Sequence, residues 1–148
     1  MFIDSEDVKQ AVVERLLELF PDTAVYKEAK TNILYPHFFV YQMNLSAQEE
    51  RKDYFNLSYP IDVRYRVASD PSTDLKLEQN LDNMALRLLQ DFNIINFENE
   101  KIRCANKSTE KVEGVLHFFF TIDILAKFVS GEEAIKQNKL GLEVKLNG

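Results

Sequence analysis

The alternation of apolar and polar residues between Tyr54 and Val67 constrains the fold more than any other feature of the chain. In YFNLSYPIDVRYRV, every odd position from Phe55 onward is apolar and most even positions are polar. A period of two predicts a β-strand with one buried face. Pro60 stands at the centre of this strand and has no amide to donate to a neighbouring strand. We therefore expect Pro60 at a sheet edge or at a bulge, with a bend in the strand near it.

A second alternating run covers residues 38–48, and the charged stretch EERKD separates the two runs. Two alternating runs around a short polar connection predict a β-hairpin. Because the connection contains neither Asn-Gly nor Asp-Gly, we expect a tip longer than a two-residue turn. If pairing is interrupted near Pro60, the part of the hairpin before it projects as an arm, and the part after it lies over the body.

The arm and the outward row of the second strand form a candidate interface with another subunit or a partner. The alternative is a plain bulge with a solvated outer face. The candidate interface residues are Glu49, Glu50, Arg51, Lys52, Asp53, Tyr54, Asp62, Arg64 and Arg66.

Two segments carry apolar residues at helical spacing. In residues 5–20, this spacing predicts a helix with acidic residues in its first turn and Pro21 after its end. The stretch SDPSTD, residues 69–74, predicts the start of a second helix that continues to about Phe92. Between the first helix and the hairpin, we expect a small strand at residues 24–26 and a loop at residues 27–36.

A long strand is predicted from Val112 to Phe128, and one or two weaker strands over residues 94–106. The even positions from Leu116 to Ala126 form the core face of the long strand. Its other face is partly apolar, which predicts a central strand covered on both sides. The outward side chains Tyr54, Phe119 and Leu125 are candidates for helix packing or a subunit interface.

These elements predict the α+β class, with an antiparallel sheet, a long β-hairpin and two main helices packed on one face. A chain of 148 residues fits one domain, which we place at residues 1–129. The polar segment 130–148 is predicted to be a C-terminal tail or arm that orders on a partner.

Composition excludes several classes of protein. A net charge of −6 argues against general affinity for nucleic acid. The single cysteine, Cys104, cannot form an intrachain disulfide, which fits a reducing compartment such as a cytoplasm. No signal-peptide core and no run of 18 apolar residues occur, so we expect neither secretion nor a membrane span. The first glycine is Gly114, which excludes an early glycine-rich phosphate loop.

No residue constellation typical of catalysis or metal binding is found. His37 and His117 lack further ligands at matched spacing. Cys104 follows Arg103, which can lower the pKa of a thiol, but a lone cysteine is more typical of a small buried hydrophobe. We therefore predict no catalytic, metal or cofactor-binding residue and a chain that is not an enzyme. An enzyme built on the scattered carboxylates stays open as a weaker hypothesis.

Acidic residues recur four apart on the second predicted helix, at Asp70, Asp74, Glu78 and Asp82. Like charges at this spacing destabilise a helix slightly. A solvated face, with acids favoured near the helix start, explains the pattern. The sharper hypothesis is an acidic surface that repels DNA passing close by, and Asp74, Glu78 and Asp82 are its candidate lumen face.

Five stretches in this order resemble a known family. They are VERLLELFP, YPHFFVYQMN, RKDYFNLSYPIDVRYRV, LEQNLDNMALRLLQDF and LHFFFTIDIL. Over residues 5–128, the chain resembles the small tail terminator, or tail completion, proteins of phages and prophages of Gram-positive bacteria. The resemblance lies in the order and texture of the elements, since the family pattern contains no catalytic motif.

The resemblance implies a subunit of a hexameric ring in the tail or neck of a virion, assembled in the bacterial cytoplasm. Such a ring caps the tail tube, ends its polymerisation and joins tail to head. Its implied partners are further copies of the chain, the tail tube protein and head–tail connector proteins, while DNA passes through without specific binding. The alternatives are another neck or tail-completion protein, or a cytoplasmic regulatory α+β domain that binds a small ligand.

Overall fold

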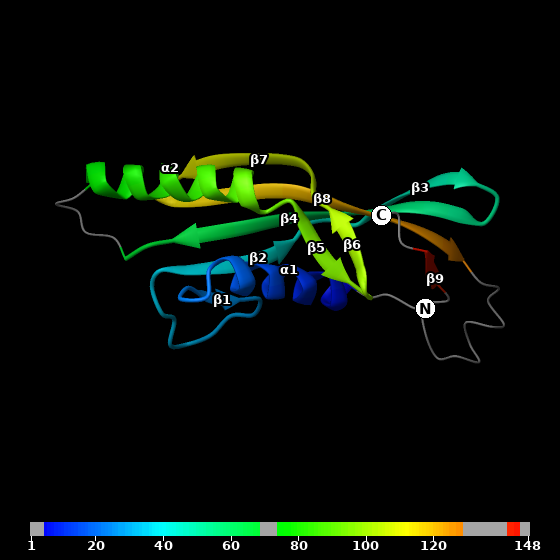
Figure 1. Ribbon diagram of the computed structural model, residues 1–148, viewed down its shortest axis with the longest axis horizontal. Coiled ribbons are helices and arrows are strands. Elements are labelled where there is room, and N and C mark those ends of the chain that lie inside the picture. Colours follow the sequence, from blue (N-terminus) through cyan, green and yellow to red (C-terminus); the bar gives the residue numbers. More distant parts are fainter. Residues whose placement is uncertain (1–4, 69–73, 129–141, 146–148) are drawn as a thin grey trace.

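A computed structural model describes residues 5–68, 74–128 and 142–145 (Figure 1). The elements are α1 (Ser5–Leu19), β1 (Ala24–Tyr26), β2 (His37–Gln42), β3 (Ser46–Arg51), β4 (Tyr54–Arg66), α2 (Asp74–Asp91), β5 (Ile94–Phe97), β6 (Glu100–Arg103), β7 (Ala105–Val112), β8 (Val115–Phe128) and β9 (Leu142–Lys145). The predicted α+β class is confirmed.

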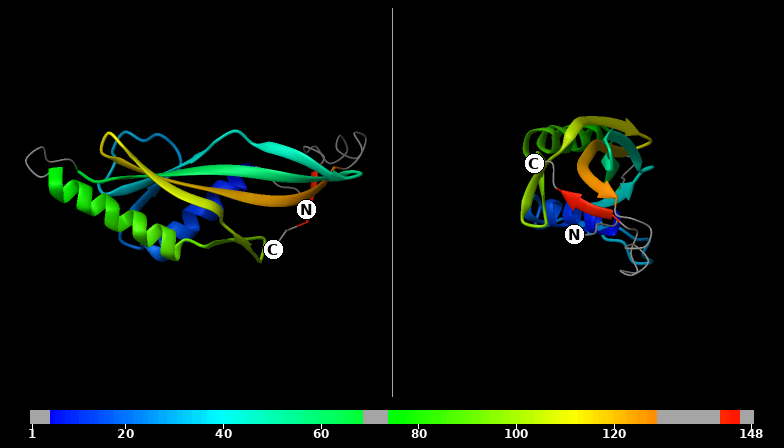
Figure 2. Two further views of the ribbon diagram at one scale, coloured as in Figure 1. Left: turned by 90° about the horizontal axis from the view of Figure 1, so that it is seen from above. Right: turned by 90° about the vertical axis from the view of Figure 1, so that its right-hand side faces the viewer.

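The main sheet has seven strands, five of which follow the order β1-β2-β4-β8-β7. β3 continues the β2 side of β4 towards the hairpin tip, and β9 pairs with β8 where β8 runs past β7. Among the described strands, only β1 and β2 pair in parallel, so the sheet is mixed rather than purely antiparallel. Seen end-on, the sheet curves around both helices and the small β5–β6 sheet (Figure 2).

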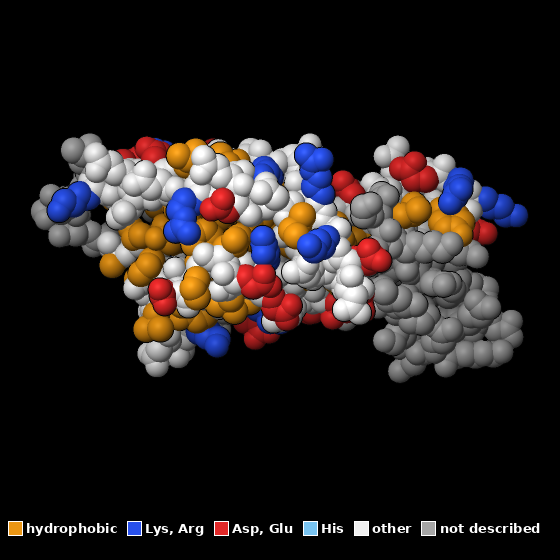
Figure 3. Space-filling model, in the orientation of Figure 1, with side chains coloured by type: hydrophobic (Ala, Val, Ile, Leu, Met, Phe, Trp, Pro, Cys, Tyr) orange, Lys and Arg blue, Asp and Glu red, His pale blue; other side chains and the backbone are white. Residues whose placement is uncertain are grey.

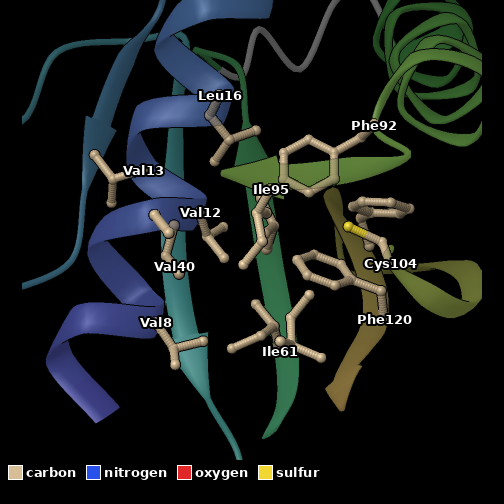
Figure 4. Packing of buried hydrophobic residues seen from close by; sticks show 14 of the residues in the cluster. Val8, Val12, Val13, Leu16, Val40, Ile61, Phe92, Ile95, Cys104 and Phe120 are labelled. Carbon is tan, nitrogen blue, oxygen red and sulfur yellow. The ribbon is translucent and has the colours of Figure 1, made fainter. Parts of the chain in front are cut away.

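α1 begins at Ser5, with Glu6 and Asp7 in its first turn, and ends at Leu19 just before Phe20 and Pro21. Acids in this position complement the partial positive charge of a helix N-terminus. Its buried face comprises Val8, Ala11, Val12, Val13 and Leu16. In Figure 4 this face points towards Val40 and Ile61 of the sheet. Burial of each of its valine and leucine side chains stabilises the fold by about 1.5–3 kcal/mol.

The second half of the core is aromatic. Phe92, directly after α2, is fully buried with its ring centroid 5.1 Å from that of Phe120 and 5.6 Å from that of Phe118. Ile95 of β5 lies beside it in Figure 4. The predicted core face of β8 is confirmed, because its even positions from Leu116 to Ala126 are all buried. Both helices therefore pack on one face of the sheet.

The opposite face of β8 is half-buried, at His117, Phe119 and Leu125 among others. β8 lies between β4 and β7, so its predicted central place is confirmed, and no described helix covers this second face (Figure 2). The strand also begins at Val115 rather than at position 112. The preceding residues form β7, which was not predicted, and a turn at Glu113 and Gly114, both with positive φ, joins the two strands.

Pro60 sits opposite a bulge. On one side β4 pairs without interruption with β8, where Pro60 faces Thr121, so the expectation of a sheet edge is wrong. On the other side, the pairing of β4 with β2 stops at Gln42–Ile61, and its pairing with β3 begins at Ser46–Ser58. Residues 43–45 thus face residues 59–60, which is a bulge on the partner strand. The Pro60 carbonyl accepts a hydrogen bond from the Met43 amide at 2.8 Å. The missing amide of Pro60 therefore faces the bulge, where no regular partner is lost.

The hairpin tip is tighter than expected. Arg51 pairs directly with Tyr54, which leaves Lys52 and Asp53 as a two-residue turn. Asp53 has φ 65°, a left-handed conformation that aspartate tolerates better than most residues. The predicted longer loop is therefore wrong, and Glu49 and Glu50 belong to strand β3.

Two predicted segments fall largely outside the described residues. Residues 69–73 of the predicted helix start SDPSTD are not described, and α2 is described from Asp74. Of the predicted C-terminal arm, only β9 is described.

Candidate interaction surfaces

The uncovered face of the main sheet carries an aromatic and charged row. Phe39 and Tyr41 of β2 stack at a centroid distance of 4.5 Å, and His117 and Phe119 of β8 stack at 5.8 Å. β4 runs between them, and the Arg64 guanidinium lies 3.9 Å from the centroid of the Tyr41 ring. The alternation of β4 therefore does place its polar residues on an outer face, as predicted, but aromatic rings flank them.

Asp62 is the buried centre of this row, with its side chain only 5% exposed. Its carboxylate accepts hydrogen bonds from Arg64 Nε at 2.9 Å and from His117 Nδ1 at 3.0 Å. A buried carboxylate without such donors would be costly. Asp62 and Arg64, which were predicted as interface residues, are therefore partners of each other. Arg66 is exposed, and no carboxylate of the described residues lies within ion-pair distance of it.

The tip of the β3–β4 hairpin forms one end of the elongated molecule (Figures 1 and 2). Every residue of β3 is exposed, and acidic and basic side chains gather at this end in Figure 3. The Arg51 guanidinium lies 4.5 Å from the centroid of the Tyr54 ring. Within the described ranges, no cation lies within ion-pair distance of Glu49 or Glu50. The predicted arm is thus a projecting hairpin with available carboxylates.

The acidic face of α2 is partly neutralised from the neighbouring edge strand. Lys111 Nζ of β7 lies 2.7 Å from both Glu78 Oε2 and Asp82 Oδ1. The hydrogen bonds to Asp82 and then Glu78 raise the pKa of Lys111, so this lysine stays charged. α2 begins at Asp74, whose side chain lies outside the described part, as does Asp70. The candidate lumen face is therefore less acidic than its sequence indicates.

A basic cleft, which sequence analysis missed, lies between α1, the segment after β1 and the strands β2 and β4. It encloses about 540 Å³. Its charged lining comprises five cations and one carboxylate: Lys9, Lys27, Lys30, Arg64, Arg66 and Glu28. The cations come from three separate segments, so no local sequence signal marks them. Their excess is notable in a chain of net charge −6.

His37, which was weighed as a metal ligand, and Cys104, which was weighed as a nucleophile, are both buried. Burial lowers the pKa of His37, the hydrogen bond from its Nδ1 to the Leu34 carbonyl opposes this, and the charge of Arg66 lowers the pKa further. Burial raises the pKa of Cys104 to about 12, against smaller opposing effects of Lys107 and Arg15. A thiol with this pKa stays protonated near neutral pH and is a poor nucleophile.

Among residues 5–68, 74–128 and 142–145, no group of three or more His, Cys, Asp or Glu side chains is arranged to hold a metal ion. A search of the same residues for a helix with the length and apolar character to cross a membrane found none.

Comparison with known protein families identifies a match. The family model described as "Phage tail terminator protein" matches residues 7–134, from α1 to beyond β8. A comparison with curated proteins found no match.

Proposed function

Because this chain belongs to the phage tail terminator family, we propose that it is a non-enzymatic subunit of a homo-oligomeric ring of six copies that ends tail assembly. The family supports a structural role in tail completion and a place in the virion tail. The proposal adds that the ring caps the tail tube, stops its polymerisation and offers a surface for head attachment. The tail tube protein and head–tail connector proteins are its proposed partners.

The observation that carries the proposal is the family match over most of the chain, and the surfaces of the molecule are consistent with it. The described residues present a projecting hairpin, a sheet face that no described helix covers, and a basic cleft, all of which suit protein contacts. Ring closure needs an interface between two different patches of the same subunit. The elongated shape, with the hairpin at one end, provides distinct patches for this purpose (Figure 1).

The acidic α2 face is proposed to line the passage for DNA. Charge-neutral variants, Glu78→Gln with Asp82→Asn, test this without adding repulsion against Lys111. DNA should then adhere to the assembled ring more strongly at low salt, because the repulsion between acidic groups and phosphates is reduced. Unchanged DNA retention by assembled rings would remove the lumen assignment and leave the ring proposal intact.

Two measurements test the ring. Light scattering coupled to size-exclusion chromatography, with negative-stain imaging, should show a ring of six subunits, alone or on tail tubes. The purified protein should also stop elongation when it is added to polymerising tail tube protein from its own virus. Tubes that elongate equally with and without the protein would contradict the capping role. A monomer under both conditions would contradict the ring.

A further inference from the structure

We infer that the β3–β4 hairpin tip of one subunit docks in the basic cleft of a second copy of this chain. The inference deepens the proposed function, on which it rests, by naming where neighbouring subunits meet. The receiving patch is the basic cleft, and the inserting patch is the tip formed by β3 and the Lys52–Asp53 turn.

The cleft contains cations that no carboxylate of the described residues neutralises. Lys9 and Lys27 share Glu6, and Arg64 is paired with Asp62. Lys30 and Arg66 have no carboxylate within ion-pair distance among the described residues. Both side chains are exposed, so a carboxylate from another molecule can reach them. An ion pair formed as water is excluded is stronger than the same pair in open solvent.

The hairpin tip supplies that charge. Glu49 and Glu50 are exposed on β3 and lack a cation within ion-pair distance among the described residues. Arg51 lies over the Tyr54 ring and so does not neutralise them. The direct Arg51–Tyr54 pair leaves a two-residue turn, so the tip is narrow enough to enter a cleft. The cleft volume of about 540 Å³ admits side chains of a tip rather than a whole domain.

Apolar residues flank both patches and favour the same pairing. Met43 and Leu45 are exposed in the bulge between β2 and β3, close to the arm. Leu34 and Tyr35 are exposed beside the cleft, and Tyr35 is part of its lining. Specific protein interfaces combine an apolar centre with polar groups around it. A contact that extends from the tip to the base of the arm would bury both exposed pairs.

The positions of the two patches set the symmetry of the contact. The hairpin tip lies at one end of the long axis, and β1 with the segment after it lies towards the other end (Figures 1 and 2). One copy therefore offers its tip to a second copy while its own cleft receives the tip of a third. A contact between two different patches is heterologous, and it closes into a ring when the rotation permits.

Charge reversal provides the test in the full-length protein. The tip variant carries Glu49→Lys and Glu50→Lys, and the cleft variant carries Lys30→Glu and Arg66→Glu. All four side chains are exposed, so circular dichroism should show wild-type folding. Each variant alone should associate at least tenfold more weakly than wild type, because like charges then meet. Matched controls on the β5–β6 hairpin, Glu98→Lys with Glu100→Lys and Lys101→Glu with Arg103→Glu, should assemble like wild type.

Recovery of assembly by combining the two variants is the decisive measurement. An equal mixture of the tip and cleft variants should recover the ring, because every tip then meets a cleft of opposite charge. Native mass spectrometry should find equal numbers of the two variants in each ring. A chain with all four substitutions should also assemble. Rings formed by either variant alone, or variants that fail to assemble in the mixture, would overturn the docking inference. A wild-type chain that never assembles would instead overturn the proposed function.

Discussion

Removal of the Asp62 carboxylate should destabilise the fold more than removal of a surface carboxylate with the same ion-pair distance. Asp62 Oδ2 lies 2.9 Å from Arg64 Nε, and Glu18 Oε2 lies 2.9 Å from Arg15 Nη1. The side chain of Asp62 is 5% exposed, whereas that of Glu18 is 53% exposed. The two substitutions Asp62→Ala and Glu18→Ala therefore separate the effect of burial from the effect of distance.

The expected magnitude follows from the donors left behind. Asp62 accepts from Arg64, whose side chain is 33% exposed, and from His117, which is 17% exposed. A hydrogen bond to a charged group contributes about 1.5–3 kcal/mol when it is well buried. Arg64 can turn to solvent, so we discount its share and expect a loss of about 2–3 kcal/mol for Asp62→Ala. The Glu18→Ala change should cost about 0.5 kcal/mol or less, as exposed pairs do.

Urea titration followed by circular dichroism measures both free energies of unfolding. The titrations should be run at two protein concentrations, so that a contribution from subunit association is separated from folding. In thermal melts, a loss of 2–3 kcal/mol should lower Tm by roughly 5–10 °C for a chain of this size. If Asp62→Ala and Glu18→Ala differ by less than about 0.5 kcal/mol, the buried network does not stabilise the sheet and the reasoning from burial is wrong.

Three further predictions concern the core and the titrating groups. Phe92→Ala should cost about 3–5 kcal/mol in urea titrations, against at most about 0.5 kcal/mol for Leu86→Ala, which removes an exposed side chain. Cys104 should react with a thiol reagent at pH 8 only as the protein unfolds, because its pKa is raised to about 12; fast labelling of the native protein would contradict this. Because the pKa of His37 is lowered in the folded state, the unfolded chain takes up a proton first as pH falls below about 6.5, and stability should fall. His37→Gln should reduce that part of the pH dependence, and an identical profile would refute the assignment.

The features that sequence could predict are those with a strong local signal. The core face of β8 was predicted correctly, because every even position from Leu116 to Ala126 is apolar, and a period of two is typical of a strand. β7 was missed because ANKSTEKV is polar and lies at a sheet edge, with most of its side chains exposed. The tight hairpin tip was missed because Lys52–Asp53 lacks the usual Asn-Gly or Asp-Gly signal, although Asp53 adopts a positive φ.

The basic cleft shows why a surface can escape sequence analysis. Lys9 lies on α1, Lys27 and Lys30 follow β1, and Arg66 ends β4. The parallel pairing of β1 with β2 and the packing of α1 against both strands bring these segments together, and neither the pairing direction nor the place of the helix can be read from the local sequence. Arg64 and Arg66 were singled out from the β4 pattern alone. Of the lysines that complete the cleft, Lys9 was placed on the first predicted helix and Lys27 and Lys30 in a loop, all without a role.

The three charged residues of β4 were treated as one outward row, yet their places in the sheet give them different roles. Asp62 lies opposite Tyr41 on one side and Phe119 on the other, in the middle of the sheet. A charge there is surrounded by protein and needs partners from its own chain, which Arg64 and His117 provide. Arg66 lies opposite His37 at the start of β2, one residue past the last pair with β8. A charge at that margin stays exposed and is available to a carboxylate from another subunit. An alternating pattern therefore identifies the outer face of a strand. The strand register then decides which charges on that face are available for binding.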